Sequence, residues 1–282
     1  MKKRQVIFLF TAALCAACVA LSVVQYRCAR SFLHSMTFVT QDTSFDSDTL
    51  VDIVQPAQDD EQAYTAAAWY ARTDQTITAV ENQRSCQTDV IAVYGASRCV
   101  LPYGKNLQTD QRGGCIISEK LAEELFASHA VEGQEIVYKG TVWRICGVVK
   151  QPERLFLFEA ASQLETMPFD HISVVLPSDA SRQLTAARFM SKYGLSAQLL
   201  RLDFYSSVQW IAEIVPAKWS DFAGWEQNWN EKKQEIQLVS SAEKSAAEVL
   251  YLQQVKRGQR YAGAAALLAL LTFVQYRKMR QK

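Results

Sequence analysis

An uncharged run of nineteen residues, 6–24, constrains this sequence more than any other feature. As an α-helix it would be about 28 Å long, close to the roughly 30 Å hydrocarbon core of a bilayer. Three cations precede it, and small residues near its end also allow a cleavable signal peptide. The run is longer than the roughly 7–15 apolar residues of such a peptide, which favours an uncleaved transmembrane helix.

A second apolar run, 261–276, lies near the other end and is followed by a basic segment, 277–282. Sixteen residues are few for a membrane span, but the tyrosines at its ends can reach the interface. Its small residues would let another helix approach closely. A buried C-terminal core helix is the alternative. The basic residues that follow favour a second transmembrane helix.

Two spans would leave 1–5 and 277–282 as short tails on the same side of the membrane. These tails carry seven Lys or Arg residues, and the opposite flanks of the two runs carry five. The difference is a weak bias toward cytoplasmic tails. From charge alone, the orientation stays open.

Between the runs, strand and helix patterns interleave without a regular strand–helix–strand repeat. We therefore expect an α+β fold, placed at 30–215. Lys139 and Gly140 predict a tight hairpin, Ser118 is expected to cap a helix, and a second hairpin turn is expected at 73–75. Strand patterns occur at 35–40, 65–72, 76–80, 89–94, 115–117, 135–138, 141–149, 171–176 and 197–204, and helix patterns at 119–127 and 182–193.

Residues 216–258 are predicted to form a helical, membrane-proximal stalk. A heptad-like apolar spacing across 222–239 indicates a packed helix face. Ser240 and Glu243 have the spacing of a capping box, which predicts that the next helix starts there. Three tryptophans in this stretch also suit a membrane interface, although a packed helix face is the more common reason for such residues. They are Trp219, Trp225 and Trp229.

Of the seven cysteines, two lie in the first apolar run. Cys86 and Cys99 flank the strand pattern at 89–94, and a disulfide between them would close a short loop. Such a bridge is worth about 3 kcal/mol if it acts through the entropy of the unfolded chain. It requires an extracytoplasmic location, and reduced thiols are the alternative, because spacing cannot fix a pairing.

Several function classes find no support in the sequence. The 30 Lys and Arg nearly balance the 29 Asp and Glu, which argues against a nucleic-acid partner. No phosphate-binding loop or nucleophile elbow occurs, and the three histidines lack metal-ligand spacing. We therefore expect no enzyme activity, no catalytic residues, no cofactor and no metal site.

A series of segments within 94–149 carries a resemblance to a known family. The segments are the turn LPYGKNL at 101–107, the strand and helix CIISEKLAEELF at 115–126, VEGQEI at 131–136 and WRICGVV at 143–149. They resemble the MacB-like periplasmic core domain of ABC-transporter permeases. The family pattern is an L-x-x-G-R turn, an apolar strand, an S-x-x-L-A-x-x-L-F helix, a G-x-x-I strand and a V-x-G-V-V strand. The match covers about a fifth of the chain, and Lys105 stands where the pattern has Arg.

The resemblance implies that the domain lies outside the cytoplasm between two spans, with both tails inside. Permeases of the family continue with further spans, whereas one span follows the domain here. The resemblance therefore implies a non-catalytic, permease-like component of an ABC-type export or transmembrane signalling complex. Its expected partners are the lipid bilayer, an ABC ATPase and another permease subunit. A free-standing cell-surface scaffold or ligand-binding module is the alternative.

Overall fold

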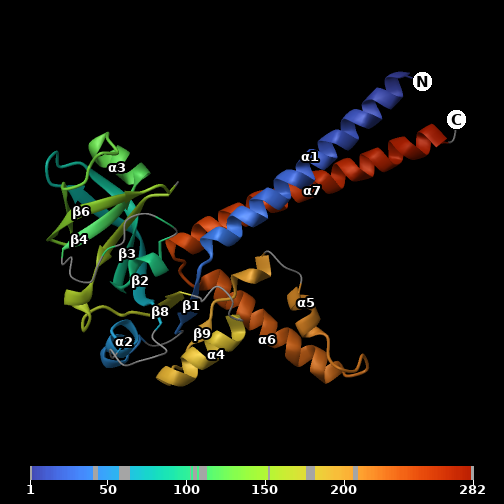
Figure 1. The fold of residues 1–282 in the computed structure, drawn as a ribbon. Coiled ribbons are helices and arrows are strands. Elements are labelled where there is room, and N and C mark those ends of the chain that lie inside the picture. Colours follow the sequence, from blue (N-terminus) through green and yellow to red (C-terminus); the bar gives the residue numbers. More distant parts are fainter. Residues whose placement is uncertain are drawn as a thin grey trace.

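The computed structural model describes residues 2–40, 44–56, 64–101, 103, 107, 113–151, 153–175, 182–205 and 209–280. Figure 1 shows a β-rich domain joined to two long helices that run side by side away from it. Both ends of the chain lie at the far end of this helix pair. They would therefore lie on the same side of any layer that the pair crosses.

Six of the described strands pair in a closed ring. In ring order they are β2 (Ala66–Ala79), β3 (Ser85–Gly95), β7 (Leu155–Glu159), β4 (Gly114–Ser118), β6 (Thr141–Val149) and β5 (Glu135–Tyr138). The pairs β3–β7 and β4–β6 are parallel, and the other four pairs are antiparallel. Each strand has two neighbours, so this part of the sheet has no open edge.

Strand β2 joins this ring to a smaller sheet. It has fourteen residues, about 46 Å, and its first residues pair with β8 (His171–Val175) as well as β3. The smaller sheet continues from β8 to β1 (Ser35–Val39) and β9 (Gln198–Leu199). A bulge between Arg72 and Gln75, where φ of Asp74 is 53°, bends β2 between the two parts. The turn predicted at 73–75 is therefore wrong, because the chain continues there as one bent strand.

Two local predictions are confirmed. Lys139 and Gly140, with φ of 48° and 78°, form the tight turn between β5 and β6. The hydroxyl of Ser118 accepts the backbone N–H of Leu121 at 3.3 Å and caps α3 (Glu119–Phe126). The apolar side of α3 then packs on the ring, where Leu125 is buried.

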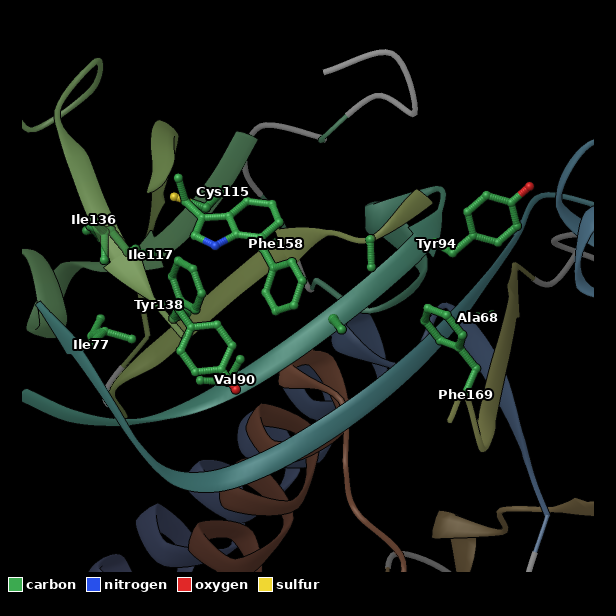
Figure 2. Packing of buried hydrophobic residues seen from close by; sticks show 14 of the residues in the cluster. Ala68, Ile77, Val90, Tyr94, Cys115, Ile117, Ile136, Tyr138, Phe158 and Phe169 are labelled. Carbon is green, nitrogen blue, oxygen red and sulfur yellow. The ribbon is translucent and has the colours of Figure 1, made fainter. Parts of the chain in front are cut away.

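Aromatic and aliphatic side chains fill the ring. The ring centroids of Trp143 and Phe158 are 4.4 Å apart, and Tyr138 meets Phe156 edge-on at 5.6 Å. Figure 2 shows members of this core gathered between the strands, among them Ile77, Val90, Ile117, Ile136, Tyr138 and Phe158. Apolar burial of this kind is the dominant stabilising contribution to a fold.

The smaller sheet is covered on one face by α2 (Ser47–Val54) and α4 (Arg182–Tyr193). Phe189 of α4 stacks on Phe38 of β1 with centroids 5.0 Å apart, and Leu50 of α2 is buried in the same cluster. The other face contacts the start of α7 (Ala246–Arg280), where Ala246 packs in one cluster with Trp69 of β2.

The helix pair consists of α1 (Lys2–Phe32) and α7 (Ala246–Arg280), packed along much of their length (Figure 1). Ser22 donates to the carbonyl oxygen of Gly258 at 3.0 Å, and the Cys15 thiol donates to that of Ala265 at 3.3 Å. The Tyr26 ring lies against Gly258, where a Cβ would come within 3.2 Å of it. Small residues on α7 thus allow close approach of the two backbones.

Among the described helices, α1 is the one that is long and apolar enough to cross a membrane. An 18-residue window within Val6–Phe32 has a mean hydropathy of 2.6, and the side chains of this stretch are mostly exposed. The predicted second run, 261–276, is part of α7 and does not reach the same criterion. It nevertheless leaves Leu267 and Leu270 exposed by 66% and 63%.

Candidate functional site at the helix junction

The junction between the β-rich domain and the helix pair is an elbow at 242–245, between α6 (Phe222–Ser241) and α7. The Ser245 hydroxyl accepts the backbone N–H of Glu248 at 3.3 Å, and the Glu248 carboxylate accepts the backbone N–H of Ser245 at 2.9 Å. These two bonds form a capping box at the start of α7. The capping box predicted at Ser240 and Glu243 is wrong, since Ser240 still lies in α6 and donates to the carbonyl oxygen of Gln237.

The Glu248 carboxylate is buried, with 2% of the residue exposed, and it reaches the smaller sheet. Its second oxygen accepts the hydroxyl of Thr37 on β1 at 2.6 Å. Thr37 in turn is 2.9 Å from the hydroxyl of Ser173 on β8, which accepts the indole N–H of Trp69 on β2 at 2.8 Å. One carboxylate therefore links the first turn of α7 to three neighbouring strands.

Strand alternation explains why these polar groups face α7. In the register of β1, β8 and β2, Thr37 pairs with Ser173, and His171 pairs with Trp69. Successive residues of a strand point to opposite faces, so Phe38 and Ile172 turn toward the apolar core on the other side. The polar face of this sheet therefore contacts the first turn of α7, and the apolar face contributes to the core.

The buried polar chain continues beyond Trp69. Its indole ring stacks on the His171 ring, with centroids 4.0 Å apart, and Nδ1 of His171 lies 2.5 Å from a carboxylate oxygen of Asp170. His171 is 2% exposed, and its Nε2 has no hydrogen-bond partner in the described part of the chain. Buried polar groups of this kind fix the arrangement of their neighbours, because breaking one bond leaves the other group unsatisfied.

An apolar cluster beside this chain holds both long helices and α6 together. Ala29 of α1, Tyr251 of α7 and Leu238 of α6 are all buried in it, with Val39 of β1. Thus the domain contacts both members of the helix pair.

A cleft of about 200 Å³ opens between the elbow and the ring. Charged residues of both signs line it, and burial raises the pKa of Asp89 while it lowers the pKa of Lys244. Gln151 in its wall is buried, and its side-chain oxygen has no partner among the described residues. On the rim, Glu153 accepts the amide of Gln253 on α7 at 2.7 Å. The cleft therefore lies where α7 and the ring meet.

A second cleft of about 180 Å³ lies against the ring, away from the elbow. Tyr70, Tyr138 and Met167 line it together with two cations, Arg72 and Lys139. The guanidinium of Arg72 lies 5.2 Å from the centroid of the Tyr70 ring, and the Lys139 ammonium lies 5.3 Å from that of Tyr138. This combination suits a ligand with an apolar body and an anionic group.

The structure does not bring the expected disulfide partners together. Cys86 and Cys99 are free thiols near opposite ends of β3, and residues 86–95 alone span about 30 Å as a strand. A disulfide requires Cα atoms within about 7 Å of each other. The Cys86 thiol instead donates to the Glu124 carboxylate at 2.9 Å; burial and this bond raise its pKa to about 11. Burial raises the pKa of Cys99 to about 12.

The sequence did not reveal the junction residues. Ser245 and Glu248 have capping-box spacing, which is a signal that could have been found, but Ser240 and Glu243 compete with the same pattern. Nothing local connects Thr37 or Ser173 with Glu248, since these residues meet only through the sheet. Among the residues that the structure describes, no group of three His, Cys, Asp or Glu side chains is placed to hold a metal ion.

Comparison with known proteins places these features in context. The family model described as the MacB-like periplasmic core domain matches residues 13–192. The periplasmic region of MacB from Actinobacillus actinomycetemcomitans is 13% identical, with a TM-score of 0.47 over 65% of this chain and 95% of that one. The extracellular domain of the noncanonic ABC-type transporter YknZ from Gram-positive bacteria is 15% identical, with a TM-score of 0.42 over 59% and 100%. A search of curated proteins found no match.

Proposed function

The chain belongs to the family of MacB-like periplasmic core domains, and from this membership we propose that it is a non-catalytic, permease-like component of an ABC-type export or transmembrane signalling complex. The family match includes the segments 94–149 on which the sequence-based resemblance rested and extends to most of the β-rich domain. The association with transporters follows from the family. The role of this chain within such a complex is the proposal.

In the proposed topology the chain crosses the plasma or inner membrane twice, through 6–24 and 261–276. The core domain, 30–215, and the stalk, 216–258, lie outside the cytoplasm, and the tails 1–5 and 277–282 lie inside. Two observations support this arrangement. The two helices run side by side to a common end (Figure 1), and both carry exposed apolar side chains, such as Phe10 and Leu267.

The single observation that carries the proposal is the buried link from Glu248 to the smaller sheet. Because the first turn of α7 is tied to Thr37 on β1, a movement of the helix pair is passed to the extracytoplasmic domain without a flexible connection. The apolar cluster around Tyr251 adds α1 and α6 to the same unit. A component built in this way converts a motion in the membrane into a motion outside it.

The energy for such a motion would come from partner subunits. The sequence contains no phosphate-binding loop, so nucleotide hydrolysis would be supplied by an ABC ATPase on the cytoplasmic side. Another permease subunit would be the partner within the membrane. The helix pair of this chain would contact that subunit through its exposed apolar side chains.

Purification from the native membrane in a mild detergent tests the proposal. We expect an ATPase-bearing partner to co-purify with the chain and its ATPase activity to be present in the same fraction. The surface variant Val142→Ala, on the exposed side of β6, should retain the partner. Repeated recovery of the intact chain as a homo-oligomer without an ATPase would contradict the transporter assignment.

The alternative, a free-standing ligand-binding module, draws support from the two clefts at the ring. It predicts that the purified chain binds a small ligand and that no ATPase accompanies it. The same purification therefore separates the two functions.

A further inference from the structure

The connection between α5 (Gln209–Ile214) and α6 forms a tip that exposes large aromatic side chains. Trp219 is 77% exposed and Phe222 is 80% exposed, and Val215 beside them is also exposed. Single exposed apolar residues are common, but adjacent aromatic residues that are almost wholly exposed usually mark a contact surface. The packed helix face expected for these tryptophans thus holds at most for Trp225, which is half-buried.

The tip has a defined structure that holds these side chains outward. Asp221 accepts the backbone N–H of Gly224 at 2.9 Å and caps α6. The Trp225 indole donates to the carbonyl oxygen of Trp219 at 3.3 Å, and the two rings lie 5.3 Å apart. A Cβ on Gly224 would come within 2.5 Å of the Asp221 carboxylate, so this glycine permits the tight turn.

Ion pairs hold the base of the same hairpin. Glu213 at the end of α5 lies 2.8 Å from Arg201 and 2.5 Å from Lys232 of α6. The pKa of Glu213 is lowered to about 2, first by its bond with Arg201 and also by Lys232. The capped turn fixes the tip of the hairpin and the ion pairs fix its base. The exposed aromatic side chains therefore have a defined position relative to the elbow.

That position brings the tip toward the membrane. Helices α6 and α7 leave the same elbow, and Figure 1 shows both running to the same side of the β-rich domain. The twenty residues of α6 reach about 30 Å from the elbow, whereas α7 covers about 22 Å between Ala246 and Tyr261. An inclined α6 can therefore carry its tip to the level at which α7 would enter the membrane.

We propose that the α5–α6 tip inserts Trp219 and Phe222 into the interfacial layer of the membrane that holds α1, as a third membrane contact of the chain. This inference rests on the membrane placement in the proposed function. Indole rings favour the interface because they have an apolar body and one N–H donor. Lys218 beside Trp219 is exposed and can reach lipid phosphates, and the carboxylate of Asp221 balances its charge. The contact is therefore directed to a lipid surface and does not require anionic lipid.

Quenching of tryptophan fluorescence by brominated lipids tests the tip in the full chain, reconstituted into bilayers. Trp219 is one of six tryptophans and the Trp225 ring lies 5.3 Å from it, so we expect bromines placed near the headgroups to quench only part of the emission. Trp219→Phe should reduce this quenched fraction. Trp210→Phe is the matched control, because Trp210 lies at the base of the hairpin against Phe204, and it should leave the fraction unchanged.

A further variant, Phe10→Trp, separates this inference from the proposed function. Phe10 is exposed on α1 within the predicted span, so its replacement should be quenched by bromines deep in the acyl chains. If Phe10→Trp is quenched and Trp219 is not, the tip contact is wrong and the span stands. A Trp219 emission that responds to an added protein partner and not to brominated lipid would also overturn the tip contact. If neither position is quenched, the membrane placement itself fails.

Discussion

The closed ring and the helix junction lie next to each other but are held by different interactions. In the ring, Trp143, Phe156 and Phe158 are stabilised by apolar contacts on all sides. At the junction, a few directional hydrogen bonds to Glu248 fix the orientation of the domain relative to α7. Apolar burial tolerates small shifts of its parts, whereas a buried carboxylate has one arrangement that satisfies it. The ring therefore provides stability, and the junction provides a defined coupling.

Removal of a core aromatic side chain should have the largest effect and should act on the whole domain. Phe156→Ala deletes a fully buried ring, which costs about 3–5 kcal/mol of unfolding free energy. The thermal unfolding temperature of the purified chain should fall sharply. Val142→Ala, on the exposed side of the same ring of strands, should leave it nearly unchanged. Equal losses in the two variants would show that the ring is not the stabilising core.

Loss of the buried carboxylate should have a smaller and more local effect. Glu248→Ala leaves the Thr37 hydroxyl and the Ser245 N–H without their acceptor, which costs about 2–3 kcal/mol. Amide hydrogen exchange should become faster in β1 and in the first turn of α7 but not in the ring. Glu248→Gln retains one side-chain carbonyl acceptor and should show a weaker form of the same change. Uniform acceleration across the ring would contradict a local coupling role.

Overpacking the interface between α1 and α7 should have a smaller effect again. Gly258→Leu places a side chain where the Tyr26 ring lies, and such overpacking costs about 1–2 kcal/mol. The unfolding temperature in detergent should drop, and Tyr26→Ala in the same chain should restore part of it. If Tyr26→Ala adds its own loss and gives no rescue, the two helices do not pack at this point.

The smallest expected effect is a dependence of stability on pH at the cleft. Burial raises the pKa of Asp89 above its ordinary value of 3.8, so its charged form is less favourable in the folded state. Stability from this residue is therefore retained at low pH and lost as the pH rises through the raised pKa. Asp89→Asn should raise the unfolding temperature at pH 7 and leave it unchanged near pH 3. A gain of equal size at both pH values would mean that the charge is not the cause.

Much of the fold was accessible from the sequence where local rules decide the outcome. Glycine and a cap residue predicted the turn at Lys139 and the start of α3 at Ser118, and the family segments predicted the core domain. The bent strand β2 was not predicted, because a polar Thr-Asp-Gln sequence fits a turn as well as a bulge. The disulfide was misjudged because spacing along the chain does not show that β3 separates Cys86 from Cys99.

The candidate site was largely hidden from sequence reasoning. Glu248 meets Thr37 across 211 residues, and no local pattern near either residue indicates this contact. The exposed position of Trp219 depends on how α5 and α6 close their hairpin, and a helical spacing alone indicates the opposite. Contacts between distant segments thus decide both the buried link at the junction and the exposure of the α5–α6 tip.

The central claim is that the helix pair crosses the membrane and holds the domain on the outer side. Lysine modification by a membrane-impermeant reagent tests it directly in intact, right-side-out membrane vesicles. Lys139 on the ring and Lys278 at the far end of α7 are both exposed in the structure. We predict that mass spectrometry finds Lys139 modified in intact vesicles and Lys278 modified only after permeabilisation. Modification of both lysines to the same extent in intact vesicles would contradict the account.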